Sequence, residues 1–141
     1  SYRRFNREVS APINHHWGYD NRTTGLRVPD AAPKNYRIEN RFPGADINPY
    51  LAIAATLACG YLGMKNKIQP SAAFEGNAYE EDIDVPRTLE EALRGLQENQ
   101  EIIDIFGEKF IQLYTSIKLV EFEEFNRVIS SWEREHLLLN V

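Results

Sequence analysis

Five cationic side chains and one glutamate lie between positions 21 and 49 of this 141-residue chain. They are Arg22, Arg27, Lys34, Arg37, Glu39 and Arg41. Arginine presents a rigid, permanently charged fork of donors that matches phosphate oxygens. A carboxylate among arginines stays anionic at ordinary pH, and its oxygen suits Mg2+ or Mn2+, which in turn bridge phosphates. The stretch therefore predicts a site for a nucleotide triphosphate and a metal, whose chemistry would be electrostatic stabilisation of phosphoryl transfer.

The same side chains have a plainer interpretation, as salt bridges on the polar surface of a strand. The chain has no P-loop pattern, and no serine or cysteine stands in the context of a nucleophile. His15 and His16 are adjacent, so on a strand they face opposite sides and cannot easily share one metal. We interpret both as surface or hydrogen-bonded core histidines.

The cationic residues must be positioned by short strands and turns. The segment Tyr36–Phe42 is predicted to be a strand, and its alternation places Arg37, Glu39 and Arg41 on one face. Like charges on a face that lines a cavity need anionic partners. Two further short strands are predicted, over residues 13–17 and 26–28.

The first predicted helix begins at Asn48-Pro49, an asparagine cap followed by proline at the first helical position. The run that follows, residues 50–64, is apolar on every side, so we expect this helix to be buried or closely packed. Strands that come early and helices that come late indicate an α+β fold.

Further helices are predicted toward the C-terminus. Thr88 opens a capping box, and Asn99 caps another short helix that ends before Gly107. The segment 108–139 is periodic at helical spacing and forms either one helix or two helices with a break near Leu119.

The net charge of −5 is unevenly distributed. Residues 1–41 hold eight basic and four acidic residues, a balance of +4, and residues 42–141 hold eight basic and 17 acidic residues, a balance of −9. The basic part favours an anionic ligand there. A small nucleic-acid-binding module is one candidate, but the acidic remainder argues against it, and we expect no nucleic-acid partner.

The single cysteine, Cys59, excludes a disulfide within the chain and fits a reducing compartment, so we expect a cytoplasmic protein. No segment reaches the length of a membrane span, and no membrane partner is expected. The chain opens on Ser-Tyr-Arg-Arg without an initiator methionine, which suggests a part of a longer polypeptide.

Several segments combine charged positions with a fixed order and spacing. They are Asn21–Pro29, Pro33-Lys34, Arg37–Gly44 and Asn48–Ala52. Together they resemble the C-terminal signature region of the glutamine synthetase family, and the resemblance extends over essentially all 141 residues. A second set is similar to the γ-glutamylpolyamine branch, the glutamate–putrescine ligases. It comprises Trp17–Arg22, Glu39–Asp46, Ala58–Tyr61 and Val128–Glu135.

The resemblance implies an ATP-dependent ligation in which the γ-carboxylate of glutamate is phosphorylated and an amine then attacks the γ-glutamyl phosphate. It implies that Arg22 and Arg41 contact the transferring phosphate and the glutamate, and that Arg27 and Arg37 hold the ATP phosphates. Glu39 would bind the Mg2+ or Mn2+ that bridges those phosphates. The residue implied near the adenine is Lys34. The alternatives are a glutamine synthetase that uses ammonia and a structural homologue without activity.

The resemblance also implies the architecture. We expect residues 1–141 to form a C-terminal segment of the catalytic domain, with an active-site part of strands and loops over 1–47 and a helical part over 48–141. A few antiparallel strands near the N-terminus would be backed by the mostly helical part. The remaining metal ligands and amine contacts would lie upstream, the full-length parent would form a homo-oligomer of stacked rings, and these 141 residues alone would be inactive. The loop at Tyr79 departs from the adenylylated pattern of some relatives, so we expect no adenylylation.

Overall fold

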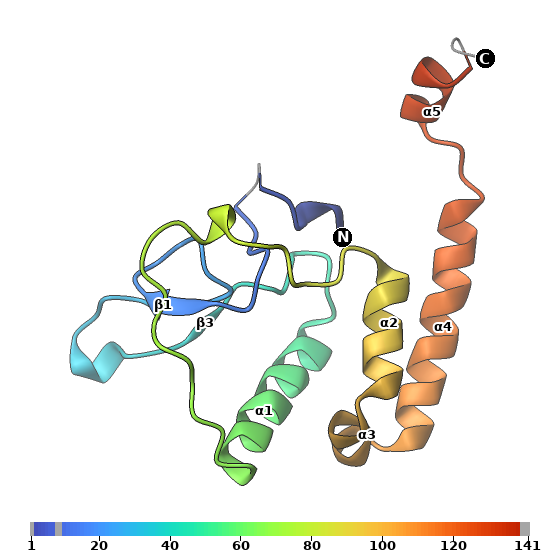
Figure 1. Ribbon diagram of the computed structural model, residues 1–141. Coiled ribbons are helices and arrows are strands. Elements are labelled where there is room, and N and C mark those ends of the chain that lie inside the picture. The colour runs from blue at the N-terminus through green and yellow to red at the C-terminus, as the bar shows by residue number, and fades with distance from the viewer. Residues whose placement is uncertain (1, 8–9, 139–141) are drawn as a thin grey trace. The chain divides into compact units, whose positions relative to one another are not determined.

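The computed structural model describes residues 2–7 and 10–138, and it divides into two compact units, Ser1–Ala92 and Leu93–Val141 (Figure 1). Among the described residues, the first unit contains the strands and the first long helix, and the second is mostly helical. The expected α+β class is confirmed.

A three-stranded sheet lies in the first unit, in the order β1-β2-β3. Its strands are β1 (Trp17–Tyr19), β2 (Leu26–Val28) and β3 (Glu39–Asn40). β2 and β3 are antiparallel, as expected, with Arg27 opposite Glu39, but β1 and β2 are parallel. Residues 20–25 form a loop that brings the chain back beside the start of β1, so that β2 runs in the same direction as β1. The N–H groups of Gly25 and Leu26 both donate to the His16 carbonyl, at 2.9 and 3.2 Å.

The predicted strand over 26–28 is confirmed, but two strand predictions are wrong in extent. Of the segment Tyr36–Phe42 only Glu39 and Asn40 join the sheet, and of residues 13–17 only Trp17 does. The β2–β3 pairing consists of two residue pairs, Leu26 with Asn40 and Arg27 with Glu39. The chain before β3 is instead a 3-10 turn, η2 (Pro33–Asn35).

The core of the first unit forms where residues 11–14 pack against the segment around η3 (Ala78–Glu80). Ile13 and Ala78 are fully buried, and the buried Asn14 donates from Nδ2 to the Ala78 carbonyl at 2.7 Å. The Asp84 N–H donates to the Ile13 carbonyl at 3.1 Å. The segment that carries η3 is thereby held beside the sheet.

The two histidines have local roles, as predicted. His15 Nδ1 lies 2.8 Å from Asp84 Oδ1, and the His16 ring stacks on Phe74 with 4.4 Å between ring centroids. Among residues 2–7 and 10–138, no three His, Cys, Asp or Glu side chains form a group that could hold a metal ion.

The helix α1 (Pro49–Lys65) begins as predicted. The Asn48 side chain accepts from the N–H groups of Tyr50 and Leu51, at 3.0 and 3.3 Å. The expectation that this helix is buried is wrong for the described chain, because only Ala58 and Leu62 are buried. Large apolar side chains along it are exposed, among them Tyr50, Leu57 and Met64. No described helix combines the length and the apolar character that crossing a membrane requires.

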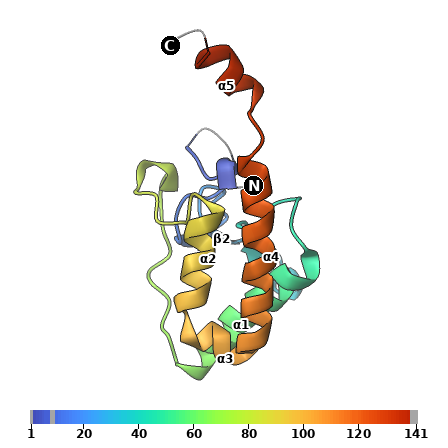
Figure 2. The ribbon, with the colours of Figure 1, turned by 90° about the vertical axis from the view of Figure 1, so that its right-hand side faces the viewer.

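Four helices follow: α2 (Leu89–Glu98), α3 (Gln100–Phe106), α4 (Glu108–Asn126) and α5 (Ser131–His136). Thr88 and Asn99 cap α2 and α3 as predicted, and Gly107 ends α3 with φ +87°. α2 and α4 lie side by side with α3 joining them at one end (Figure 2). The tail is two helices, but the break lies at residues 127–130 rather than near Leu119, because a capping box at Ser130 starts α5.

Candidate nucleotide site

A cavity of about 620 Å³ opens on the first unit, and residues from distant parts of its sequence line it. The lining residues are Arg7, Ser10, Arg22, Thr23, Arg27, Glu39, Arg41 and Tyr79. Four of them are arginines and one is a carboxylate, so the cavity is a site of positive charge that suits an anion.

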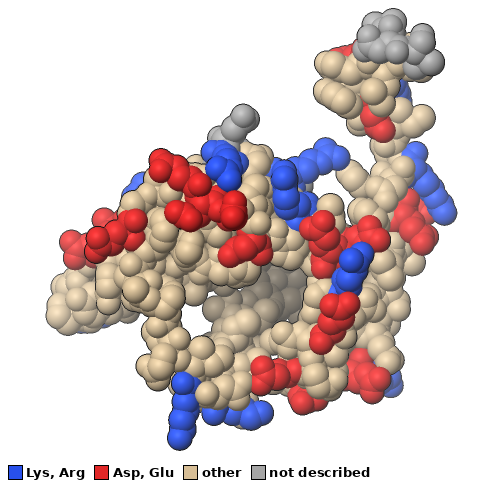
Figure 3. Space-filling model, in the orientation of Figure 1, with Lys and Arg blue, Asp and Glu red and all other residues tan. Residues whose placement is uncertain are grey.

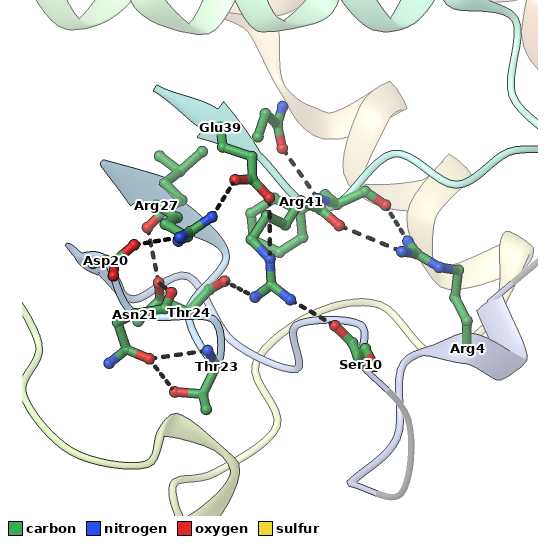
Figure 4. A network of polar contacts seen from close by, with 12 residues as sticks. Arg4, Ser10, Asp20, Asn21, Thr23, Thr24, Arg27, Glu39 and Arg41 are labelled. Atoms are coloured by element: carbon green, nitrogen blue, oxygen red, sulfur yellow. Dashed lines mark hydrogen bonds and ion pairs between the residues drawn. The ribbon is translucent and has the colours of Figure 1, made fainter. Parts of the chain in front are cut away.

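Arg27 on β2 and Glu39 on β3 are opposite each other in the antiparallel ladder. Arg27 Nη1 therefore reaches Glu39 Oε2 at 2.9 Å, and Arg27 Nη2 binds Asp20 Oδ1 on the other side (Figure 4). The hydrogen bond to Asp20, followed by the one to Glu39, raises the pKa of Arg27. In return, the hydrogen bond and charge of Arg27 hold the pKa of Asp20 below its usual value.

Arg41 is held chiefly by backbone carbonyls. Its Nη1 donates to Thr24 O and its Nη2 to Ser10 O, both at 2.7 Å, while its Nε lies 3.7 Å from Glu39 Oε1. The side chain is only 12% exposed. Because neutral acceptors orient this guanidinium, much of its charge is left for a ligand in the cavity.

Arg4, on the 3-10 turn η1 (Tyr2–Arg4), supports the same segment from outside the cavity. Its guanidinium donates to the carbonyl oxygens of Phe42 and Arg41 (Figure 4). The backbone that carries Arg41 is thus bound on one side by Arg4, and on the other its N–H donates to the Gly25 carbonyl at 3.0 Å.

Arg22 reaches the cavity from the turn between β1 and β2. Asn21 Oδ1 accepts from the N–H of Thr23 at 2.9 Å and from its hydroxyl at 2.7 Å. Asn21 Nδ2 donates to the Gly76 carbonyl, and the Ala78 N–H donates to Thr23 Oγ1, both at 2.9 Å. The turn is thereby tied to the segment before η3, which places the exposed Arg22 at the cavity rim.

Lys34 and Arg37 are not brought to this cavity. Both are exposed, and Arg37 Nη1 donates to the nearby Asn35 carbonyl at 3.3 Å. The predicted common face of Arg37, Glu39 and Arg41 therefore holds only for the last two, because Arg37 precedes the ladder.

Sequence reasoning missed several residues of the site: Arg4, Arg7, Ser10, Asp20 and Tyr79. Arg4 and Arg7 had one signal, the basic cluster at the start of the chain. Around η3 the surface is acidic, with exposed Glu80, Glu81 and Asp82 (Figure 3). Arg7 Nη2 donates to the Glu81 carbonyl at 2.9 Å, so this basic residue joins the acidic segment to the cavity rim.

Glu39 is the only carboxylate among the described residues that line the cavity. Its side chain is 41% exposed, and one oxygen faces Arg27 while the other faces Arg41. Mg2+ in phosphate sites is typically held by one or two carboxylates together with phosphate oxygens and water. Glu39 fits as one such ligand, and further ligands would have to come from the substrate, from water or from other residues.

Comparison with known proteins agrees with this geometry. A family model described as the glutamine synthetase catalytic domain matches residues 1–137. The chain belongs to this family. The resemblance that the motifs indicated is therefore confirmed.

Curated relatives of the chain include ligases with different amines in their names. A glutamate–isopropylamine ligase of Pseudomonas sp is 39% identical over 94% of this chain and 30% of its own length. A γ-glutamylputrescine synthetase of Escherichia coli is 37% identical over 99% of this chain and 30% of its own length. A glutamine synthetase of Thermotoga maritima is 34% identical over 98% of this chain and 34% of its own length.

A solved structure described as apo GmaS without ligand has the same fold. It matches with a TM-score of 0.76 and 29% identity over 95% of this chain and 32% of its own. The chain thus spans about a third of the length of the proteins that it matches.

Proposed function

We propose that this chain supplies part of the active site of an ATP-dependent ligase that joins the γ-carboxylate of glutamate to an amine. The observation that carries the proposal is the convergence of Arg22, Arg27, Arg41 and Glu39 on one cavity of the first unit. Membership of the glutamine synthetase family supports it. The ligase names of the relatives support the same reaction class.

In the proposed reaction, a γ-carboxylate oxygen of glutamate attacks the γ-phosphorus of ATP, and ADP leaves. The amine nitrogen then attacks the carbonyl carbon of the γ-glutamyl phosphate, loses a proton, and inorganic phosphate leaves with the carbon–oxygen electrons. Both steps move negative charge over phosphoryl oxygens, which fixed guanidinium groups stabilise.

The roles proposed for individual residues follow their positions. Arg41 and Arg22 contact the transferring phosphate and the glutamate, and Arg27 binds the ATP phosphates. Lys34 and Arg37 are proposed as outer contacts of the nucleotide, since the exposed η2 segment carries them. Mg2+ or Mn2+, with Glu39 as one ligand, would bridge the phosphates and neutralise part of their charge.

For the amine we propose putrescine or a related polyamine. The motifs of the γ-glutamylpolyamine branch and the similarity to a γ-glutamylputrescine synthetase support this choice. Ammonia is the second candidate, because glutamine synthetases are also among the relatives. A homologue without activity is disfavoured, because Arg22, Arg27, Arg41 and Glu39 are all present at the cavity.

We further propose that residues outside this chain complete the site. The basis is that the relatives are about three times as long as the chain. The whole protein is proposed to act in the cytoplasm as a homo-oligomer of stacked rings, and the 141 residues alone are proposed to be inactive.

The test is an assay of phosphate release by the full-length protein that carries this chain, with ATP, Mg2+ and glutamate. We expect release that depends on putrescine and exceeds the release with ammonium at equal concentration. Faster release with ammonium would favour a glutamine synthetase, and no amine-dependent release with any amine would overturn the ligase proposal. A measurable rate from residues 1–141 alone would contradict the proposed inactivity.

A further inference from the structure

Asp20 binds the side chain of Arg27 although Asp20 itself is not among the residues that line the cavity. It directly follows β1, and its N–H donates to the Val28 carbonyl at 2.8 Å, which continues the pairing of β1 with β2. Its backbone has φ +45°, a left-handed conformation that aspartate and asparagine adopt more readily than most residues. The backbone thus places this carboxylate beside Arg27.

Arg27 is consequently held between two carboxylates. Asp20 accepts a hydrogen bond from Nη2 and Glu39 accepts one from Nη1 (Figure 4). The Arg27 side chain is only 13% exposed. The two partners differ in one respect, since Glu39 faces the cavity and Asp20 does not. A ligand that engages Glu39 weakens the hold of Glu39 on Arg27, whereas the contact with Asp20 persists.

We propose that Asp20 is a positioning residue for nucleotide binding, which keeps the Arg27 guanidinium directed at the cavity while the phosphates of ATP bind. The inference rests on the proposed function, because it names the residue that orients one of the proposed phosphate contacts. Without Asp20, Arg27 would pair with Glu39 alone and turn toward it. The phosphates would then lose a correctly placed donor, and Glu39 would be less available to the cavity.

A purely electrostatic role would have the opposite effect. Removal of the Asp20 charge makes the cavity more positive and would strengthen the binding of ATP. Asp20 is 56% exposed, so water and salt screen its charge, whereas its hydrogen bond to Arg27 is a direct contact. We therefore expect that loss of the correct position of Arg27 outweighs the more positive potential of the cavity. Weaker ATP binding after removal of Asp20 would support the positioning role, and tighter binding would support the purely electrostatic role.

The experiment uses the full-length protein and the variants Asp20→Asn, Asp20→Gly and Asp20→Glu. Asparagine and glycine both tolerate the left-handed backbone, so each removes the carboxylate without new strain. Glu75→Gln, a change of an exposed acid elsewhere in the first unit, is the matched control. ATP binding is measured by calorimetry without glutamate or amine, and KM and kcat are measured by phosphate release.

We expect Asp20→Gly, which removes the acceptor of Arg27 Nη2, to weaken ATP binding about tenfold. Asp20→Asn, whose amide oxygen can still accept that hydrogen bond, should weaken it less. In both variants kcat at saturating ATP should change by less than about threefold. Asp20→Glu keeps the charge but places a longer side chain on a left-handed backbone that glutamate adopts less readily, so it is expected to recover only part of the affinity. Glu75→Gln is expected to bind ATP as the wild type does. The KM for glutamate should stay the same in all variants.

ATP binding that is unchanged or tighter in both Asp20→Asn and Asp20→Gly would overturn the inference. Equal losses for ATP and glutamate together with a lower melting temperature would do the same, because they indicate a structural role only. If Asp20→Asn does not fold, Asp20→Gly and Asp20→Glu decide the matter. A wild type that fails to bind ATP would overturn the proposed function and this inference with it, whereas a wild type that binds ATP as Asp20→Gly does would overturn the inference alone.

Discussion

The cationic stretch contains two regions that have similar compositions but different surroundings. Arg27 and Arg41 are almost buried, and carboxylates and carbonyl oxygens fix their guanidinium groups. Lys34 and Arg37, a few residues away, lie exposed on and after the η2 turn. The first region lines the cavity and the second does not.

The difference shows that a charged residue becomes part of a site through the backbone that carries it. Arg27 and Glu39 meet because a ladder of hydrogen bonds pairs β2 with β3. Arg37 lies only two residues before Glu39, but it stands before the ladder begins. Guanidinium groups that are already fixed in place stabilise the negative charge of a ligand without reorganising. Exposed cations must first be ordered, so they contribute less to the binding of that charge.

Replacement of Arg41 should give the largest effect. In the full-length protein we expect Arg41→Ala to reduce kcat by about 100-fold or more, as for the loss of a fixed donor to a developing charge. The free energy of unfolding should fall by about 1–3 kcal/mol, because Thr24 O and Ser10 O lose their donor. Phosphate release and urea unfolding measure the two effects.

The control for this variant is Arg94→Ala, which removes an exposed arginine of α2. It should leave both quantities unchanged. A rate for Arg41→Ala within tenfold of the wild-type rate would contradict the central role given to the buried region.

Glu39→Gln should have the next largest effect, because it removes the carboxylate that pairs with both Arg27 and Arg41. We expect kcat/KM for ATP to fall about 10- to 100-fold and the Mg2+ concentration for half-maximal rate to rise. Initial rates at fixed ATP and varied Mg2+ measure both. An unchanged Mg2+ midpoint would argue against Glu39 as a metal ligand, and Glu75→Gln is again the matched control.

Arg37→Ala and Lys34→Ala test the exposed region directly. We expect each to raise the KM for ATP by less than about tenfold and to leave kcat unchanged, since exposed cations contribute little. Arg27→Ala, measured in parallel, should raise the KM more. If the exposed and buried arginines prove equally important, the η2 segment must move onto the nucleotide when it binds.

The pH dependence should be the smallest effect. Arg27 lowers the pKa of Asp20 in the folded state, so the ion pair stabilises the fold fully above about pH 4, the ordinary range for aspartate. This contribution is lost as the pH falls through the lowered value. The melting temperatures of wild type and Asp20→Asn should therefore differ at pH 7 and converge as the pH falls toward 2. A difference that grows at low pH would contradict the assigned direction.

The sequence allowed good prediction wherever a local interaction defines an element. Asn48 and Asn99 cap helices with their own side chains, and the short strand over 26–28 was also predicted correctly. The break before α5 had a local signal as well, the capping box of Ser130 and Glu133, although the predicted position near Leu119 was wrong. Such features depend on residues within one turn of each other.

Contacts between distant residues were less predictable. The parallel pairing of β1 with β2 and the contact of Arg41 with the Ser10 carbonyl join positions that no local rule relates. The pairing of Asp20 with Arg27 had no sequence signal, because it depends on a left-handed residue that continues the strand pairing. The prediction that α1 is buried was also wrong, because an apolar composition does not determine which other segments pack against a helix.

By itself, the sequence determined the family, the chemical character of the site and the starts of most helices, because these depend on residue types and short spacings. Only the tertiary structure decided which charges share the cavity. Arg22, Arg27, Glu39 and Arg41 line it, and Lys34 and Arg37 do not, because a short ladder and a few backbone carbonyls bring certain side chains together. These contacts join residues that are far apart in the sequence, so local patterns do not predict them.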